Sequence, residues 1–447
     1  MPKKKTALTI EERLQQALVP AEEQPYEVPE NWVWVRLGAV CYASKEKSND
    51  FSNEIKYIGL EHLEKDKGIV GFSSADKVKS TKNAFQEGQI LYGRLRPYLN
   101  KHDIVSFSGV CSTDILVFEA SVLVANVLVD KFFNLPFFIE YVVANSKGIN
   151  LPRVSEETVL NTTFPLPPLL EQQRIVERIE ELFAKLDEAK ERLQEVANSF
   201  AVRKAAILHK VFTGELTQQW RRENGVSDES WEEKKLEEVC SKITDGTHNS
   251  PTNSLSGEYM YVTAKNIKDT GIDLSNITYV TKEVHKEIYS RCDVIYGDVL
   301  YIKDGATAGI ATINTLKEEF SMLSSVALIR TDLKLAKNEF VKDYLNYRKK
   351  EILKNISGSA ITRLTLSKIK DILIPLPTLP EQHEIVRLID DLLARERAAQ
   401  QATEQALASI DLMKKSILAR AFRGELGTNK ASEASALELL KQVLAEN

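Results

Sequence analysis

The segment Pro165–Ile179 reads PLPPLLEQQRIVERI, and the segment Pro375–Ile389 reads PLPTLPEQHEIVRLI. A constant shift of 210 positions relates the two, and the same shift relates FTGEL at 212–216 to FRGEL at 422–426. A period of about 200 residues is far longer than the roughly 20 to 50 residues of solenoid repeats. The chain is therefore built twice, and the duplicated unit is a domain followed by a connector.

The stretch before each connector matches its counterpart only at intervals. Near the start of each stretch the shift is 199, and the matched residues are Trp32, Leu37, Val40 and Cys41 in the first copy and Trp231, Leu236, Val239 and Cys240 in the second. Further on, GQILY at 88–92 matches GDVLY at 297–301 with a shift of 209. Because apolar and glycine positions are kept while the shift grows, we expect one framework with different loops. Similar cores with dissimilar loops are typical of modules that recognise different things.

These matches divide the chain into five parts. They are an N-terminal arm and linker (1–28), a first α/β domain (29–164), a connector helix and linker (165–228), a second α/β domain (229–374), and a second connector helix with a C-terminal helix (375–447). The expected fold class is α+β, with two similar α/β domains separated by two long helices in a pseudo-two-fold internal repeat.

The connectors have the spacing of a coiled coil. In the first, apolar residues alternate at intervals of four and three, as an a/d seam does; they are Ile175, Ile179, Leu182, Leu186, Ala189, Leu193, Val196 and Phe200. The equivalent residues of the second connector are Ile385, Ile389, Leu392, Glu396, Ala399, Thr403, Ala406 and Ile410. We expect the helices to pack antiparallel, with the bulky middle of the first against the small middle of the second. Gly214 and Gly424 are expected to end them, which gives a rod of about 60 Å.

Composition sets broad limits on function. The 447 residues suffice for two or three domains, and 43% hydrophobic and 28% charged residues are ordinary for a soluble protein. No apolar run is long enough for a membrane span, and the basic start Met1–Lys5 lacks the apolar region of a secretory signal. The four cysteines form no CxxC pair. We therefore expect a cytoplasmic protein. A net charge of −5 argues against a non-specific coat on nucleic acid but allows local basic patches.

Taken together, the paired connectors resemble those of the DNA-specificity subunits of type I restriction–modification enzymes. The resemblance covers nearly the whole chain and depends on two P-L-P-x-L-x-E-Q-x-x-I-V connectors, at 165–176 and 375–386, each leading to a long helix closed by F-x-G-E-L. A D-G-T-H tetrapeptide at 245–248 and the two G-x-x-L-Y segments support it. Each motif is weak alone, whereas the pair at constant offset is specific.

The resemblance implies a division of labour. The subunit is not catalytic, and each of its target-recognition domains reads one half of a bipartite, asymmetric double-stranded DNA target while the helical rod sets the gap. Two methyltransferase subunits dock on the duplicated helices, and motor-nuclease subunits join them. AdoMet, ATP and Mg are expected on those partners and no cofactor on this chain. The arm and the C-terminal helix, with its apolar pattern over 436–444, are expected to complete a quasi-symmetric circle.

Missing motifs agree with a non-catalytic role. The sequence has no GxxxxGK[ST] loop for a nucleotide and no GxGxxG loop for a dinucleotide. Asn134–Phe137 (NLPF) is only faintly similar to the tetrapeptide of amino-methyltransferases, and aromatic core packing is the better interpretation. The six histidines lack metal-ligand spacing. Catalytic and metal residues are therefore expected to be absent.

Candidate DNA contacts in the first domain follow the 88–92 strand. They are Arg94, Arg96, Tyr98, Asn100 and Lys101, with His62 from an earlier loop and Arg153 just before the connector. Arginine forks match guanine edges, and neighbouring cations take phosphates. A solvated charged strand end is the alternative for the arginines after the strand. A salt bridge to Glu156 or Glu157 is the alternative to a phosphate contact for Arg153.

In the second domain the candidates fall into four groups. They are Lys303 and Thr307 in a Gly-rich loop, the polar turn Asp245, Thr247, His248 and Asn249, the pair Lys265 and Asn266, and Arg363, which corresponds to Arg153. The turn could be a plain Asx-turn instead. Glu61 and His62 correspond by position to Lys265 and Asn266, and this change of charge suits different half-sites.

Some positions off the seam are also duplicated. They are Glu171 and Glu381, Gln172 and Gln382, Glu215 and Glu425, and Leu216 and Leu426. If these side chains are exposed, one partner docking twice explains the duplication; helix-start chemistry is the alternative for the Glu–Gln pairs. Two other function classes stay open for the chain. One is a methyltransferase or a fused restriction–methylation enzyme, and the other is a scaffold that binds proteins only.

Overall fold

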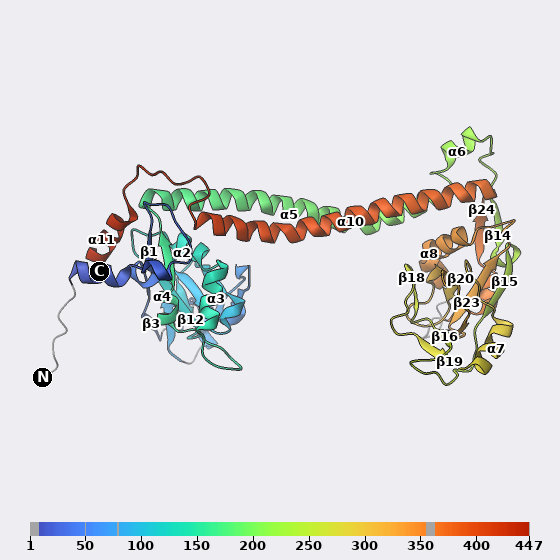
Figure 1. Ribbon diagram of the computed structural model, residues 1–447, viewed down its shortest axis with the longest axis horizontal. Helices are drawn as coiled ribbons and strands as arrows, with labels where there is room; N and C mark the ends of the chain where they lie inside the picture. The colour runs from blue at the N-terminus through green and yellow to red at the C-terminus, as the bar shows by residue number, and fades with distance from the viewer. Residues whose placement is uncertain (1–8, 50, 78–79, 355–362, 447) are drawn as a thin grey trace. The chain divides into compact units, whose positions relative to one another are not determined.

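A computed structural model describes residues 9–49, 51–77, 80–354 and 363–446 (Figure 1). Residues 1–8 of the expected N-terminal arm lie outside the described residues. The chain separates into two compact units, which we call unit 1 (1–194 with 405–447) and unit 2 (195–404). Each unit contains one α/β domain and one portion of both long helices. The expected α+β fold with an internal repeat is confirmed.

The described residues of unit 1 form three larger or flanking sheets and one separate two-stranded hairpin. The strands β1 (Val33–Arg36) and β13 (Thr163–Leu166) pair antiparallel. A four-stranded sheet has the order β10-β9-β12-β2, formed by His102–Ile104, Ile90–Gly93, Ile115–Ala120 and Cys41–Ala43. A five-stranded sheet has the order β3-β8-β11-β4-β7, formed by Lys47–Ser48, Lys82–Phe85, Gly109–Cys111, Lys56–Ile58 and Ser73–Ser74. The short hairpin β5 (Leu63–Glu64) and β6 (Gly68–Ile69) lies outside these sheets.

Besides the portions of α5 and α10, the described helices of unit 1 contribute to one hydrophobic core together with the four-stranded sheet. They are α1 (Ile10–Ala17), α2 (Asn126–Phe132), α3 (Pro136–Ala144), α4 (Glu156–Leu160) and α11 (Ala436–Glu446). The NLPF segment joins α2 to α3, because Pro136 can begin a helix but cannot continue one. Leu135 is buried there and Phe137 packs on the core, so aromatic core packing is the correct interpretation of that segment.

Unit 2 repeats this framework. Its two-stranded sheet pairs β14 (Glu232–Lys235) with β24 (Leu373–Leu376). Its four-stranded sheet has the order β15-β23-β20-β21, formed by Cys240–Asp245, Val326–Thr331, Val299–Ile302 and Ala311–Ile313. A smaller sheet has the order β19-β16-β22, formed by Thr278–Val280, Tyr259–Val262 and Phe320–Met322. The hairpin β17 (Ile267–Lys268) and β18 (Gly271–Ile272) corresponds to β5 and β6.

The two domains differ most in their helices. In unit 2 one uninterrupted helix, α8 (Asn338–Lys354), occupies the place of α2 and α3, and α9 (Leu366–Lys370) occupies that of α4. Helix α7 (Lys282–Arg291) has no counterpart among the described helices of unit 1, and α6 (Gln218–Glu223) follows the first long helix. The cores agree more closely: Ile90 and Tyr92 of β9, like Val299 and Tyr301 of β20, are fully buried.

The long helices are α5 (Leu169–Phe212) and α10 (Leu379–Ala421). In unit 1, Lys190 Nζ lies 3.3 Å from Asp411 Oδ1, and Lys414 Nζ lies 2.6 Å from Asp187 Oδ1. Rising numbers on one helix thus face falling numbers on the other. The predicted antiparallel packing is confirmed.

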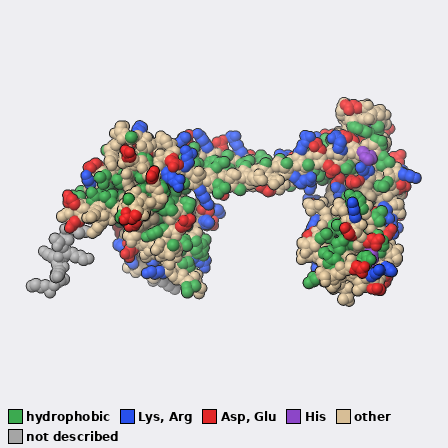
Figure 2. Space-filling view, in the orientation of Figure 1, with side chains coloured by type: hydrophobic (Ala, Val, Ile, Leu, Met, Phe, Trp, Pro, Cys, Tyr) green, Lys and Arg blue, Asp and Glu red, His purple; other side chains and the backbone are tan. Residues whose placement is uncertain are grey.

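Unit 2 shows the same direction at the other ends of the two helices. Arg203 Nη2 lies 2.9 Å from Glu396 Oε2, and Thr217, just beyond α5, bonds Glu381 near the start of α10. The middle of the seam is thinly covered, since two helices alone cannot enclose it; Val196 keeps 39% of its surface exposed. Figure 2 shows hydrophobic side chains among Lys and Arg on the surface of α5 and α10. As expected, the glycine at 214 or 424 follows each helix with positive φ, of 75° and 73°.

The N-terminal arm and the C-terminal helix meet within unit 1. Helix α1 packs against α11, and Arg13 Nη1 donates to the Leu444 carbonyl at 3.1 Å. Leu440 and Val443 of α11 are fully buried in the core of the first domain. The two ends of the described chain therefore pack against the same domain.

Candidate functional site

Glu171 and Glu381 are fully buried, so the expectation that they form an exposed docking surface is wrong. Glu171 accepts hydrogen bonds from Trp32 Nε1 (2.7 Å), Thr428 Oγ1 (3.1 Å) and Asn429 Nδ2 (2.8 Å). A buried carboxylate needs such donors, because a buried charge without partners is strongly unfavourable. In each unit this glutamate ties the start of one long helix to the segment that follows the end of the other.

The equivalent glutamate of unit 2, Glu381, is bonded in part by a cationic side chain. Glu381 Oε1 accepts from Thr217 Oγ1 at 2.6 Å and from Arg221 Nη1 at 2.6 Å. We call the two arrangements the Glu171 latch (Glu171 with its three donors) and the Glu381 latch (Glu381 with its two donors). Equivalent glutamates are thus held by neutral donors in unit 1 and by an arginine in unit 2.

The neighbouring glutamines are buried as well, so the docking expectation is also wrong for them. Gln172 accepts from the backbone N–H of Ala125 at 3.1 Å and donates to the Pro167 carbonyl at 3.3 Å. Gln382 accepts from the N–H of Lys337 at 2.9 Å and donates to the Pro377 carbonyl at 2.9 Å. Each glutamine therefore fastens a long helix to its own domain, and the duplication reflects a shared internal bond.

The other duplicated positions remain accessible in part. Glu215 and Glu425 are exposed and lie near Lys210 and Arg420 respectively, at 2.8 and 4.0 Å. The leucines that follow, at 216 and 426, are half-buried and pack on the cores of units 2 and 1. The two F-x-G-E-L turns thus present similar charged surfaces.

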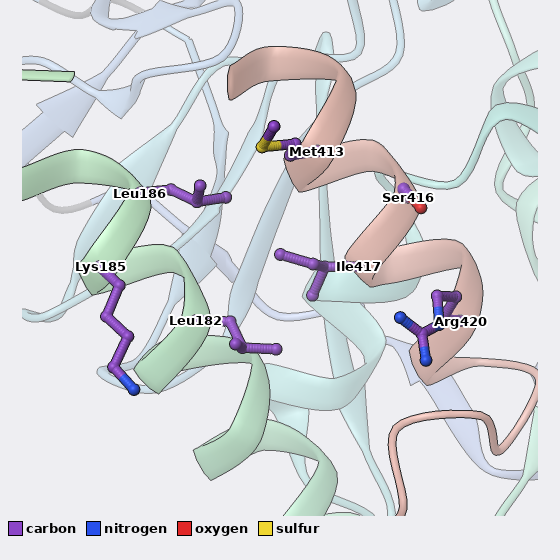
Figure 3. Close-up of a pocket in the computed structure, with 7 residues that line it drawn as sticks. All are labelled: Leu182, Lys185, Leu186, Met413, Ser416, Ile417 and Arg420. Carbon is purple, nitrogen blue, oxygen red and sulfur yellow. The ribbon is translucent and has the colours of Figure 1, made fainter. Parts of the chain in front are cut away.

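An open groove of about 330 Å³ lies between α5 and α10 within unit 1. It is lined by Leu182, Lys185, Leu186, Met413, Ser416, Ile417 and Arg420. In Figure 3 the two leucines of α5 face Ile417 of α10. The positions 210 residues from Leu186 and Met413 are Glu396 and Arg203, the ion pair of unit 2. The same place on the helix pair is apolar in unit 1 and charged in unit 2.

The predicted contacts of the first domain come together on one surface, which we call face 1. It consists of the segments 59–62, 94–101, 112–114 and 147–153. Lys101 Nζ donates to the Leu60 carbonyl at 3.0 Å, and Arg153 Nε lies 3.2 Å from Asp114 Oδ1. The backbone N–H of Arg96 bonds the Pro152 carbonyl at 2.7 Å. The sequence singled out most of these segments, and the structure adds the exposed Lys147, which pairs with Arg153 through the backbone.

The side chains of face 1 differ in how free they are. Arg96 and Arg153 are exposed, and Tyr98 keeps 50% of its surface exposed. Asn100 is committed inward, because its Nδ2 donates to the Phe133 carbonyl at 3.0 Å. Arg94 is half-buried, and its Nε has no hydrogen-bond partner within the described chain. Arg153 pairs with Asp114 rather than with Glu156 or Glu157, the partners considered from the sequence.

His62 and Asn266 are two predicted contacts that serve as internal caps. The N–H of Gly59 donates to His62 Nδ1 at 2.9 Å, and the N–H of Thr263 donates to Asn266 Oδ1 at 3.0 Å. Both bonds span three residues just before the β5–β6 or β17–β18 hairpin. Asn266 is also buried, which contradicts its expected role as a direct reader. His62 and Asn266 thus make equivalent local hydrogen bonds although they are different residue types.

The second domain has an equivalent surface, face 2, formed by the segments 245–249, 263–266, 303–307, 323–325 and 363. The N–H of Ser324 bonds the Thr247 carbonyl at 2.8 Å, and the N–H of Lys303 bonds the Ser325 carbonyl at 2.9 Å. Arg363 Nε lies 3.5 Å from Asp304 Oδ1. The exposed side chains of face 2 include His248, Asn249, Lys265, Thr307 and Arg363.

Two predicted contacts of the second domain are buried and form its electrostatic centre. Asp245 and Lys303 are both nearly inaccessible and lie 3.0 Å apart, so the expectation that they touch DNA directly is wrong. Asp245 also accepts from Arg291 at the end of α7 and lies 3.3 Å from His248 Nε2. It therefore orients an arginine whose side chain is 52% exposed. The internal repeat does not point to Arg291, because α7 has no counterpart among the described helices of the first domain.

The turn around Asp245 is shaped by packing. Gly246 lies so close to β22 that an added Cβ would be 1.9 Å from the Met322 carbonyl oxygen. Thr247 Oγ1 accepts from the N–H of Asn249 at 3.2 Å, so the side chain of Thr247 closes the turn. The side chain that closes this turn is thus a threonine and not the Asp or Asn of an Asx-turn, whereas His248 and Asn249 stay exposed.

Neither a metal cluster nor a membrane helix is found in the described segments. Over residues 9–49, 51–77, 80–354 and 363–446, no group of three His, Cys, Asp or Glu side chains could hold a metal ion. Within these same ranges, no helix combines the length and the apolar character needed to cross a bilayer.

Comparison with known proteins identifies both repeats. The family model for the type I restriction modification DNA specificity domain matches residues 29–198 and again 228–407. The chain is 27% identical over 336 residues to the EcoBI specificity subunit of Escherichia coli, covering 70% of each chain. It is 34% identical over 210 residues to the EcoDI specificity subunit of Escherichia coli, covering 44% of this chain and 45% of that one.

Solved structures share the fold. The HsdS subunit from Thermoanaerobacter tengcongensis matches with a TM-score of 0.67 at 23% identity, covering 90% of this chain and 99% of that one. A chain from a study of complex assembly in a type I R-M system matches with a TM-score of 0.69 at 24% identity, covering 90% and 100%. The chain thus belongs to the type I restriction–modification DNA specificity family, whose specificity subunits are non-catalytic, and it carries two target recognition domains.

Proposed function

We propose that faces 1 and 2 each bind one half of a bipartite, asymmetric target in double-stranded DNA. The observation that supports this most directly is that both faces lie at the same end of the same four-stranded framework, yet expose different side chains. A common scaffold with unlike surfaces suits two readers of unlike sequences. Within each face, Arg153 or Arg363 comes just before the connector and is suited to phosphate contact.

The chemistry of the faces favours DNA over an acidic protein. Face 1 combines exposed arginines with Tyr98 and has few free carboxylates, because Asp114 is paired with Arg153. Face 2 offers His248, Asn249 and an oriented Arg291, side chains that can bond base edges and phosphates. Local cationic faces on a chain of net charge −5 concentrate attraction for phosphates where reading occurs.

The helix pair is proposed to dock two methyltransferase subunits, and motor-nuclease subunits would join that assembly. The two F-x-G-E-L turns, with exposed Glu215 and Glu425, provide similar surfaces for two copies of one partner. AdoMet, ATP and Mg would then be bound by the partners, with no cofactor on this chain. Because such an assembly would act on chromosomal DNA, we propose a cytoplasmic location for the protein.

A domain exchange tests the proposal. Residues 29–164 would be replaced by the corresponding domain of the EcoBI specificity subunit, and the chimera would be expressed with its methyltransferase partner in cells without other adenine methylation. Methylome sequencing should show one changed half-site and one unchanged half-site. A matched exchange of 229–374 should change only the other half. A change in both halves from one exchange contradicts independent reading, and a parent complex that leaves no sequence-specific methylation contradicts DNA reading itself.

A further inference from the structure

Arg96 and Gly305 occupy the same position in the two domains. The two residues are separated by 209 positions, which is the shift that relates β9 to β20. The carbonyl of Arg96 accepts from the N–H of Leu99 at 2.9 Å, and the carbonyl of Gly305 accepts from the N–H of Ala308 at 3.1 Å. The preceding residues, Leu95 and Asp304, form the same bridge to the arginine before the connector. The two turns are therefore equivalent in sequence and in hydrogen bonding.

This turn requires left-handed backbone at two places. In unit 2 both are glycines, Gly305 with φ 95° and Gly309 with φ 85°. In unit 1 they are Arg96 with φ 54° and Asn100 with φ 43°. A residue with a Cβ is strained in this region, and glycine is not; asparagine tolerates it better than arginine does. Unit 1 thus keeps a strained residue where its own duplicate shows that glycine fits.

The side chain of Asn100 is bonded inside the domain, whereas that of Arg96 is not bonded to another described residue. The Asn100 amide donates to the Phe133 carbonyl at 3.0 Å and contacts His102 Nε2 at 3.2 Å. The side chain of Arg96 is exposed and makes no ion pair or side-chain hydrogen bond to another residue of the described chain. Strained residues without internal compensation cluster at functional sites, because the strain is kept for what the side chain does.

The place of Arg96 in face 1 suggests what that use is. The backbone of Arg96 is fixed on one side by the Pro152 carbonyl, and Pro97 follows it as a buried residue. A rigid backbone with a free guanidinium presents a planar fork of donors in a preset direction. In the equivalent place of unit 2, a Cβ on Gly305 would meet nothing within 4 Å, so space is open there but no fork is offered.

We propose that Arg96 is a specificity-determining residue of the first domain, reading one guanine of the first half-site. Bidentate contact with guanine O6 and N7 is the commonest specific arginine contact in the major groove. This assignment rests on the proposed DNA-reading function of face 1 and names the residue that carries it. The second half-site is read without this residue, since glycine stands at its place.

The test combines stability and specificity in the full chain with its methyltransferase partner. Arg96→Gly removes both the strain and the fork, Arg96→Asn keeps a residue that tolerates positive φ, and Arg96→Lys keeps the charge without the fork. The thermal unfolding midpoint of Arg96→Gly should equal or exceed that of the parent. Relief of the backbone strain should raise the midpoint by up to about 2–4 °C. Gly305→Ala serves as the stability control and should lower the midpoint, because its φ is 95° and its surroundings are open.

Methylome sequencing supplies the specificity readout. Arg96→Gly and Arg96→Asn should lose roughly 10- to 100-fold in methylation of the parental sites, or accept other bases at one position of one half-site, with the other half-site unchanged. Arg96→Lys should be intermediate. Unchanged sites and efficiency in Arg96→Gly overturn the assignment, and so does a lowered midpoint, since the strain argument then fails. If exchange of 29–164 still moves a half-site, the proposed function stands without Arg96; if it does not, the proposed function itself fails.

Discussion

Arg221 Nη1 donates to Glu381 Oε1 at 2.6 Å, with only 7% and 0% of the two side chains exposed. Removing one partner of a buried ion pair leaves an uncompensated charge and costs about 3–5 kcal/mol. Arg221→Ala should therefore lower the free energy of unfolding by that order, although Arg221 also contacts the exposed Asp228. Thermal unfolding measures the effect, and Arg222→Ala, at an exposed neighbour, is the matched control.

The two latches should respond unequally to the same substitution. Glu381→Gln leaves the buried Arg221 without its carboxylate, whereas Glu171→Gln faces only neutral donors, which an amide oxygen can still accept from in part. Glu381→Gln should thus destabilise by about 1–3 kcal/mol more, on the scale of a charged hydrogen bond. Equal losses from the two variants would contradict the difference in latch chemistry.

Acid sensitivity should arise in part from Asp130. Burial alone would raise the pKa of Asp130, but the contact with His102 at 2.7 Å, helped by Lys131, outweighs it and holds the pKa below its usual value. A carboxyl group whose pKa is lower in the folded state contributes its full stabilisation above the unfolded pKa of about 3.9. This stabilisation is lost as pH falls through the folded pKa. Asp130→Asn should be less stable than the parent near neutral pH, and the difference should shrink below about pH 4. Unfolding midpoints across this range check the sign.

Asp343 should show the opposite dependence. Burial in α8 raises the pKa of this carboxyl despite Lys342, and its Oδ2 has no hydrogen-bond partner among the described residues. A raised pKa favours folding at pH below the unfolded value of about 3.9, and that advantage is lost as pH rises through the folded pKa. Asp343→Asn should therefore gain stability relative to the parent as pH rises from about 4 to 7. A relative loss over that range would contradict the direction of the shift.

Matched insertions in α5 and α10 test the proposed role of the helices in setting the gap. Seven residues between Leu186 and Leu193, with seven between Ala399 and Ala406, keep the a/d register and add about 10 Å to each helix. If transmitted fully, this lengthens the non-specific gap by about three base pairs, at about 3.4 Å each, and leaves both half-sites unchanged. Methylome sequencing reads the gap directly, and full activity with the original gap would mean that other elements set it.

Repetition in the sequence was a reliable guide to the framework and an ambiguous one to the role of single residues. The heptad spacing of α5 and the glycines after the helices predicted the antiparallel pair, because those patterns depend on local geometry. The duplication of Glu171 and Gln172 suggests a shared docking surface, but both side chains are buried. Repeated residues are equally expected where the same internal bond is made twice, and only burial distinguishes the two cases.

The segments that form the candidate site can be predicted from the sequence, whereas the partners of single side chains cannot. The sequence predicts the loops that follow β9 and β20, but it does not reveal that Lys303 and Asp245 form an ion pair inside the domain. Arg291 lies on α7, for which the described part of unit 1 has no matching helix. The positive φ of Arg96 has no signal in the first domain alone, whereas the alignment of Arg96 with Gly305 indicates a position that demands positive φ.

The division into two units has a consequence for how the protein responds to cleavage of its backbone. Each unit is built from residues on both sides of the linker that follows α6, where Asn224 and Gly225 are exposed. A cut at that linker would leave two polypeptides that still share both hydrophobic cores and both latches. Limited proteolysis there should give two fragments that elute as one species under native conditions and separate only in denaturant. An intact backbone at that point would then not be needed to keep the folded structure together. The two fragments would stay associated through the cores and latches that they share.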